Sequence, residues 1–187
     1  MAGDGHKYAL LLTLLDMGLK RQELIDAKLE HLDLGGQGKG SKDRKVYFGK
    51  STARFLKKWL KVRDKISAPV EVDNMFIGQN GVELKPRNVN RILNRISKRA
   101  GMEDADVSPH VLRHTSATMA LENGLDAFAL KKQFGWEDIE TAQRYVHMSG
   151  SRLEQAYKKS SPMDHFGKKS GKKKNDDDND QRGWVNG

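Results

Sequence analysis

The feature that most constrains the fold of this chain is a series of helices whose ends are marked by residue type. Ser108 followed by Pro109 is a strong helix start, because serine caps unpaired N–H groups and proline fits the first turn. This helix covers about residues 109–122 and ends at an Asn-Gly pair. A second helix over residues 126–134 ends at a glycine, and a third begins near Asp138. The second half of the chain is therefore predicted to be helical.

The first half of the chain is also mostly helical by pattern. Apolar residues at helical spacing predict helices over about residues 6–17, 21–27, 52–62 and 86–99. The glycine-rich segment 35–41 cannot hold a long strand, so we expect a tight hairpin that returns through residues 46–48. A further short strand is expected at residues 75–77. The predicted fold class is mainly α with a small antiparallel β-hairpin sheet (α+β).

The charge of the chain favours a polyanionic partner. The 187 residues include 34 Lys and Arg against 25 Asp and Glu, which gives a formal net charge of +9. Positive charge spread along a folded chain favours DNA or RNA. The alternative is a basic protein with no nucleic-acid role, and charge alone does not separate the two.

Several classes of protein are disfavoured by what the sequence lacks. It contains no cysteine, so disulfides, cysteine zinc fingers and a cysteine nucleophile are excluded. No apolar stretch approaches the ~20 residues of a membrane span, and no signal peptide is evident. We expect a cytoplasmic, nucleoid-associated protein with no membrane partner.

The composition changes near residue 160. Lysine runs at residues 168–169 and 172–174 are followed by an aspartate run at 176–178, a pattern that cannot bury a core. We therefore predict one catalytic domain over residues 1–160 and a charged, disordered tail over residues 161–187.

Four residues at fixed spacing indicate the chemistry. His110 and Arg113 are three apart, so they share one face of a helix. Trp136 follows His110 by 26 residues and Tyr145 by 35. A tyrosine from a separate helix can then meet the His–Arg pair, a set that suits cleavage of a DNA phosphodiester by a tyrosine nucleophile without a metal.

Each member of this set suits one step of the reaction. Tyr145 is a weak nucleophile as a phenol and needs cations that stabilise its oxyanion and the phosphate. The planar fork of Arg113 can bind two phosphate oxygens, and the indole N–H of Trp136 can bind one. His110, at a helix N-terminus, can donate to the phosphate or relay a proton. Lys39 on the glycine-flanked hairpin is the candidate general acid for the leaving oxygen.

Taken singly, each of these residues also has an ordinary structural interpretation. A lone tyrosine or tryptophan on a helix is usually part of a core, a lone histidine usually does no chemistry, and Lys39 is one of many lysines. The joint spacing carries the hypothesis. The candidate DNA-binding residues are equally open, since a basic helix face is either a phosphate contact or a solvated surface; they are Lys42, Arg44, Arg87, Arg91 and Arg95.

Five segments of the sequence match the motifs of one known family. They are Ser108-Pro109-His110-Val111-Leu112-Arg113-His114-Thr115, Phe134-Gly135-Trp136, Thr141-Ala142-Gln143-Arg144-Tyr145-Val146-His147, Gly18-Leu19-Lys20-Arg21-Gln22-Glu23-Leu24 and Gly38-Lys39-Gly40-Ser41-Lys42-Asp43-Arg44. Through these motifs the chain resembles, over residues 6–160, the tyrosine recombinase (phage integrase) family. The ending His147-Met148-Ser149-Gly150 looks most like archaeal members.

This resemblance implies a role for each matched position. Tyr145 forms a 3′-phosphotyrosine link to DNA, with no cofactor and no metal. His114 is structural and packs beneath the site, and Glu23 supports the first basic position of the site. The partner is double-stranded DNA, and recombination needs a homo-oligomer of four protomers on two sites. Residues 152–159 form the element that docks on a neighbouring protomer.

Three departures from the family pattern matter. The family has an arginine after Gly-Leu, and here that position is Lys20, which keeps the charge but loses the two-pronged grip on phosphate. Arg21 remains open as the true ligand through a local shift, although one step along a helix turns a side chain by ~100°. The hairpin is short, so Lys39 is expected to sit differently. There is also no room for the family's N-terminal helical domain, which clamps the other side of the DNA.

The predicted function is a site-specific DNA recombinase, or integrase, that cuts and rejoins DNA through a 3′-phosphotyrosine. The alternative is a catalytically impaired integrase-like protein that binds DNA or regulates, and Lys20 and the absent clamp domain are its evidence. A third interpretation is a strand-relaxing topoisomerase of the related IB type, which the small size disfavours.

Overall fold

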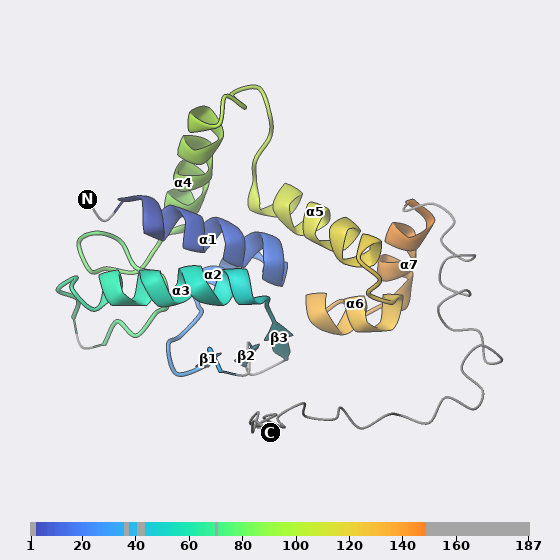
Figure 1. Ribbon diagram of the computed structural model, residues 1–187, viewed down its shortest axis with the longest axis horizontal. Helices are drawn as coiled ribbons and strands as arrows, with labels where there is room; N and C mark the ends of the chain where they lie inside the picture. The colour runs from blue at the N-terminus through green and yellow to red at the C-terminus, as the bar shows by residue number, and fades with distance from the viewer. Residues whose placement is uncertain (1–2, 36–37, 41–43, 70, 149–187) are drawn as a thin grey trace, which may run out of the picture. The chain divides into compact units, whose positions relative to one another are not determined.

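A computed structural model describes residues 3–35, 38–40, 44–69 and 71–148, all within the compact unit Met1–Gly150. Lys42, the predicted docking segment 152–159 and the predicted tail lie outside the described residues, so the boundary at residue 160 stays a prediction. Figure 1 follows the elements along the chain, which are α1 (Gly3–Met17), α2 (Arg21–Ile25), β1 (Leu32–Asp33), β2 (Gly38–Gly40), β3 (Lys45–Tyr47), α3 (Lys50–Arg63), α4 (Pro86–Arg99), α5 (Pro109–Glu122), α6 (Ala127–Phe134) and α7 (Ile139–Met148).

The predicted helix ends agree with the structure where capping chemistry marks them. The Ser108 hydroxyl accepts a hydrogen bond from the Val111 N–H at 3.4 Å, and Pro109 opens α5. The Asp126 carboxylate accepts hydrogen bonds from the N–H groups of Phe128 and Ala129 and caps α6. Gly135 ends α6 with a left-handed φ of 63°. The mainly helical fold class is confirmed.

The small sheet has three strands where the sequence predicted a hairpin. Its order is β1-β2-β3 with both pairings antiparallel. Lys39 lies in the middle strand, with Leu32 opposite on one side and Val46 opposite on the other. The strand that the prediction missed, β1, has two residues, which is too short for an alternating pattern to reveal.

The strand predicted at residues 75–77 is wrong. These residues are fully buried, but the chain there makes only isolated bridges, between Lys28 and Asn74 and between Ile77 and Glu83. A continuous apolar run fits a buried strand and a buried irregular segment equally well, and only a long-range partner strand separates them. The Met75 carbonyl instead accepts a hydrogen bond from the Trp59 indole N–H at 2.8 Å.

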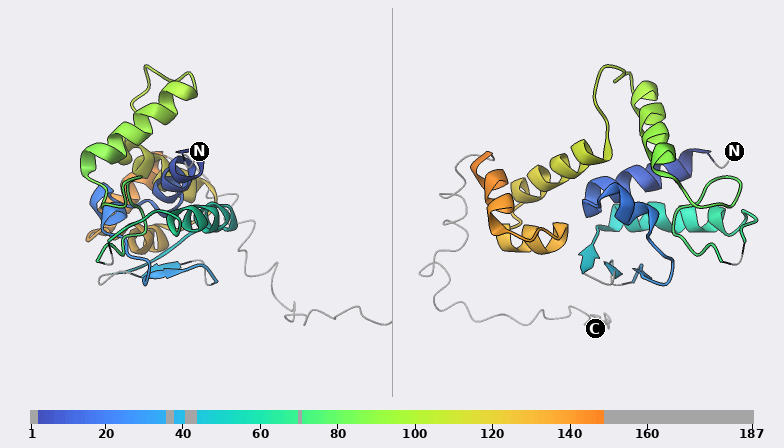
Figure 2. Two further views of the ribbon diagram at one scale, coloured as in Figure 1. Left: turned by 90° about the vertical axis from the view of Figure 1, so that its left-hand side faces the viewer. Right: turned by 180° about the vertical axis from the view of Figure 1, so that it is seen from behind.

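Helix α1 runs through the middle of the larger hydrophobic core. It packs against α3 on one side and against α2 and α4 on the other, as the side view in Figure 2 also shows. Its buried residues Leu10, Leu14 and Met17 join Trp59 of α3 and Leu93 of α4 in this core. Burial of such side chains contributes on the order of 2 kcal/mol each to the free energy of unfolding, so this core stabilises the helices that pack in it.

A second, smaller core holds the C-terminal helices. Ala117 and Leu121 of α5, Leu130 and Phe134 of α6 and Ala142 of α7 are buried together. Helix α5 therefore belongs to both cores, with Leu112 near its start in the larger one. None of the described helices is long and apolar enough to cross a membrane.

Candidate active site

A cavity of about 500 Å³ opens where the starts of α2 and α5 meet the side of α4. Its lining includes four basic side chains and, among the described residues, no acidic one. Such a cavity favours a bound anion, because no carboxylate lies beside the cations in the described lining. Glu23 acts on Arg113 from outside the lining. The lining residues are Lys20, Arg21, Asn90, Ser108, Pro109, His110, Arg113 and Trp136.

Arg113 is the buried member of this lining, with 8% of its surface exposed. Its guanidinium donates one hydrogen bond to the Gly18 carbonyl and one, at 2.6 Å, to the Phe134 carbonyl. These bonds fix the plane of the fork and leave three of its five N–H groups for a ligand. Burial lowers the pKa of Arg113, and the carboxylate of Glu23 opposes that shift. The side chain stays a cation, because an arginine does not lose its proton in a protein.

Gly18 has a second role that the sequence did not reveal. In the sequence it is the first residue of the family motif over residues 18–24, which gives it no part in holding Arg113. In the structure its φ is +60°, and a Cβ built there would lie 2.3 Å from Cε1 of the buried Phe134 ring. Glycine therefore lets the chain pass against Phe134 while its carbonyl holds Arg113. Such a glycine can be recognised only in three dimensions, because the ring it packs against and the arginine it holds lie far from it in the sequence.

Glu23 binds Arg44 in a two-pronged ion pair, with N···O distances of 2.6 and 2.9 Å. It also accepts the main-chain N–H of Lys20 at 2.7 Å, so it fixes the backbone of the predicted first basic position. Burial acts to raise the pKa of Glu23, but the bonds from Arg44 and Lys20 and the charges of Arg44 and Arg113 together lower it. Glu23 is therefore a carboxylate near neutral pH.

Arg44 is engaged inside the domain. Besides Glu23 it donates to the Gln133 carbonyl at 3.3 Å, and its guanidinium lies where a Cβ on Gly135 would be. The side chain of Gln133 in turn pairs with both main-chain groups of Tyr47 in β3. Sequence reasoning missed this bridge between the sheet and α6, because its members are far apart in the chain. The DNA contact predicted for Arg44 stays a prediction.

Lys20 and Arg21 line the same cavity. Lys20 is the residue before the first turn of α2 and has an extended backbone, with φ −65° and ψ 152°. The ~100° rotation between neighbouring helical positions therefore does not separate these two side chains, since only Arg21 lies inside the helix. Both remain candidates for the basic position that the family fills with arginine.

Tyr145 lies beside the cavity and is held by two contacts. Its ring stacks on Trp136, with centroids 5.1 Å apart and planes 13° apart. Its hydroxyl is 3.1 Å from Nδ1 of His114. The Arg113 guanidinium carbon lies 5.7 Å from the Trp136 ring centroid, so Trp136 contacts both the cation and the tyrosine. Within the described residues, Tyr145 is not part of the cavity lining.

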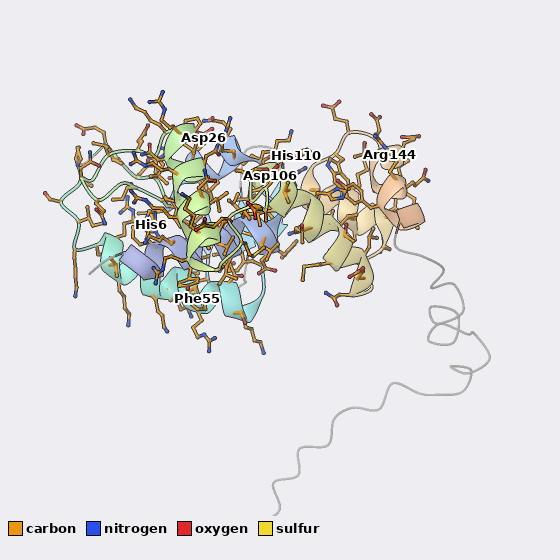
Figure 3. The ribbon with its side chains drawn as sticks, turned by 90° about the horizontal axis from the view of Figure 1, so that it is seen from above. His6, Asp26, Phe55, Asp106, His110 and Arg144 are labelled. Atoms are coloured by element: carbon orange, nitrogen blue, oxygen red, sulfur yellow. The ribbon has the colours of Figure 1, made fainter. Side chains whose placement is uncertain are left out.

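The placement predicted for His114 is wrong. The sequence predicted a residue packed beneath the site, whereas its side chain is exposed and meets Tyr145. The reason is helical spacing, because position 114 lies one turn after His110 and on the side of α5 that α7 approaches. Figure 3 shows His110 near the start of α5 and Arg144 on α7.

The structure brings together most of the predicted set. His110, Arg113, Trp136 and Lys20 line one cavity, and Tyr145 contacts the Trp136 ring. For Lys39 the backbone position in β2 is described and the side chain is not. Arg87, Arg91 and Arg95 are exposed on α4, the helix whose Asn90 lines the cavity.

Comparisons with known proteins find related sequences over most of the chain. The model of the phage integrase family matches residues 3–152. The chain is 36% identical over 159 residues to tyrosine recombinase XerC of Corynebacterium efficiens, which covers 82% of this chain and 50% of that protein. The chain therefore spans about half the length of the curated relatives it matches.

Two solved structures have the same fold. The crystal structure of XerA recombinase matches with a TM-score of 0.71 and 29% identity, over 85% of this chain and 59% of that one. The post-cleavage complex of XerH site-specific recombinase with a palindromic difH substrate matches with a TM-score of 0.66 and 26% identity, over 86% of this chain and 46% of that one.

Proposed function

Because the chain belongs to the phage integrase family, we propose that it is the catalytic domain of a site-specific DNA recombinase that uses Tyr145 as its nucleophile. The observation that carries this proposal is the cavity lined by a tethered Arg113 and other cations, with no carboxylate in its described lining and with Tyr145 stacked on its Trp136 wall. A phosphodiester is the anion that fits such a site, and the Tyr145 phenol supplies a hydroxyl for covalent attack. The Ser108 hydroxyl, which also lines the cavity, is engaged as the cap of α5.

The roles follow from position and chemistry. Arg113 binds two non-bridging oxygens of the scissile phosphate through its remaining N–H groups. His110 and Lys20, at the exposed side of the cavity, add positive charge around the phosphorus as negative charge develops. Attack by the Tyr145 oxygen breaks the bond to the 5′-oxygen and leaves a 3′-phosphotyrosine, whose bond energy supports rejoining by a 5′-hydroxyl. Lys39 is proposed to protonate the leaving oxygen.

The partner is double-stranded DNA in the cytoplasm, at the nucleoid. Arg87, Arg91 and Arg95 on α4 extend the positive surface from the cavity, which suits contacts to phosphates next to the cut. Exchange of strands between two sites requires two cuts in each duplex, so four protomers act together as a homo-oligomer. XerH, which has the same fold, was solved as a site-specific recombinase bound to its difH substrate.

A covalent-adduct assay tests the proposal. The purified chain is mixed with nicked duplexes tiled across the locus that flanks its gene, then run on a denaturing gel. We expect a slower-migrating protein–DNA adduct with the natural chain and none with Tyr145→Phe, whose affinity for the duplex stays within about twofold. An adduct that persists in Tyr145→Phe contradicts the nucleophile assignment.

The same assay decides between an active and an impaired enzyme. Lys20→Arg restores the fork that binds phosphate in two places, so it is expected to speed adduct formation about tenfold. Arg21→Lys is the matched variant on the neighbouring position. If Lys20→Arg alone forms adducts, the natural chain is a DNA-binding protein with a disabled site. If Arg21→Lys slows the natural chain strongly, Arg21 is the phosphate ligand.

A further inference from the structure

The contact between Tyr145 and His114 supplies what the proposed reaction needs at its start, a proton acceptor at hydrogen-bonding distance from the phenol. A phenol attacks phosphorus poorly while it keeps its proton, so a group beside it must accept that proton. Arg113, Lys20 and Arg21 are cations without a lone pair to offer. His110, which the sequence offers as a donor or a proton relay, lines the cavity proposed for the phosphate, and no hydrogen bond joins it to Tyr145 within the described residues.

His114 places a ring nitrogen that can accept a proton beside the phenol of Tyr145. Its Nδ1 is 3.1 Å from the Tyr145 oxygen, which is hydrogen-bonding distance, and the two ring centroids are 4.9 Å apart. A neutral imidazole carries one nitrogen without a proton, and it accepts hydrogen bonds there. The contact therefore allows Nδ1 to accept from the phenol O–H while the hydrogen of the imidazole sits on Nε2.

His114 is also fixed relative to the phosphate site. It follows Arg113 directly in α5, and Arg113 is held by the carbonyls of Gly18 and Phe134. Trp136 holds the nucleophile relative to the same arginine, since its ring contacts both the Arg113 guanidinium and the Tyr145 ring. One indole therefore contacts both the proposed phosphate ligand and the nucleophile, and His114 lies beside the nucleophile.

We propose that His114 is the general base that activates Tyr145. The inference rests on the proposed function and adds a residue to it. In the step, the O–H bond of Tyr145 breaks and its proton moves to Nδ1 of His114. The phenolate oxygen forms the bond to phosphorus, the bond from phosphorus to the 5′-oxygen breaks, and that oxygen takes a proton from a separate donor. Rejoining runs the same transfers in reverse.

The kinetic test combines two changes, one that removes the proposed base and one that makes the phenol more acidic. His114→Asn keeps a hydrogen-bond acceptor near the Nδ1 position but cannot take a proton. We expect it to slow single-turnover adduct formation on nicked duplex about 100-fold, within the range for general bases. Replacing Tyr145 by trifluorotyrosine, a more acidic phenol, is expected to recover at least tenfold of this loss.

A matched variant on the same helix separates the base from the phosphate ligands. His110→Asn makes the same replacement one turn earlier, and its loss is not recovered by the fluorinated phenol, because His110 is assigned to the phosphate. Equal losses for His114→Asn with tyrosine and with trifluorotyrosine overturn the proposal, as does full activity of His114→Asn.

A measurement without DNA keeps this inference separate from the proposed function. In the full chain labelled at the hydroxyl-bearing ring carbon of tyrosine, His114→Ala is expected to move the NMR signal of Tyr145 and to leave that of exposed Tyr47 unchanged. An unmoved Tyr145 signal overturns the inference whether or not the chain cuts DNA. Absence of adducts with the natural chain on every duplex, together with a moved signal, contradicts the proposed function and with it the catalytic role of the contact.

Discussion

Arg113 and Tyr145 are the two ends of the proposed reaction, and the domain holds them differently. Arg113 is buried and tied to two backbone carbonyls, in a helix whose start belongs to the larger core. Tyr145 is half-buried on α7, where it is held by the Trp136 ring and by an exposed histidine. The phosphate receptor is therefore built into the fold, whereas the nucleophile rests on the smaller core.

This difference teaches how the chemistry is divided. A phosphate receptor gains from being rigid before the substrate arrives, because no reorganisation is then needed as charge develops. A nucleophile must adjust its position to reach phosphorus while it keeps the contact with its proposed base, so few contacts should hold it. The predictions below test this division, beginning with the change expected to have the largest effect.

Arg113→Lys removes the planar guanidinium from the rigid phosphate site. Lysine cannot bind both carbonyls and a phosphate in two places, so we expect single-turnover cleavage to fall about 10²–10³-fold. Arg144→Lys is the control, since Arg144 lies exposed on α7 with one long hydrogen bond, to Thr141. Its cleavage rate is expected to stay within twofold. Comparable losses in the two variants would contradict the assignment of Arg113 as the phosphate ligand.

Gly18→Ala perturbs the anchor of Arg113 without touching Arg113. The added Cβ meets the buried Phe134 ring and must adopt a φ of +60°, so we expect a loss of about 3 kcal/mol in the free energy of unfolding. Gly101→Ala is the matched control, with a φ of +68° but open space around its Cβ. It is expected to cost about 1 kcal/mol in urea unfolding. A difference below 0.5 kcal/mol, roughly the error of such a comparison, would contradict the packing role of Gly18.

Acid should weaken the larger core through His6. This side chain stacks on Trp59 with centroids 4.3 Å apart, and burial first, then the charge of Lys7, lowers its pKa to about 4. The unfolded chain therefore takes up a proton more readily, so stability falls as the pH drops from 6.5 towards 4. Because the side chain is partly exposed, we expect about 2 kcal/mol of this loss rather than the full value of the shift. In urea unfolding at pH 7 and pH 4.5, His6→Phe should lack this part of the decrease; an identical decrease would exclude His6.

The two sides of α1 should differ in DNA binding. Arg91 lies on α4, next to the cavity, whereas Lys57 lies on α3 on the other side of α1, and Figure 3 shows Phe55 of α3 away from His110. We expect Arg91→Glu to weaken binding to duplex about tenfold and to reduce the salt slope by about 1. Lys57→Glu, the same change of charge for a lysine, should weaken it less than threefold. Equal effects would mean that DNA binding depends on the net positive charge of the chain and not on where that charge lies.

Local chemistry explains which parts of this structure are predictable from sequence. Pro86, Ser108, Pro109 and Gly135 act on their own turns, so the helices they begin or end were predicted correctly. The family motifs also contain the basic residues and the tryptophan of the cavity lining. The strand predicted at residues 75–77 was wrong because strand pairing depends on a partner elsewhere in the chain.

The unpredicted features of the site are all long-range. Arg44 meets Glu23 across 21 positions, Gly18 meets Arg113 across 95, and His114 meets Tyr145 across 31. No periodicity or capping rule links such positions. The sequence shows that an arginine, a histidine and a tyrosine are present at the spacing of a known family, but not which backbone carbonyls orient the arginine or which histidine reaches the tyrosine.

The most direct test of the account is to locate the covalent bond. The natural chain is incubated with nicked duplex, the adduct is digested with trypsin and nuclease, and the modified peptide is sequenced by mass spectrometry. The account predicts a nucleotide attached through its 3′-phosphate to Tyr145. A nucleotide on any other residue, or the absence of an adduct on every duplex of the flanking locus, would contradict it.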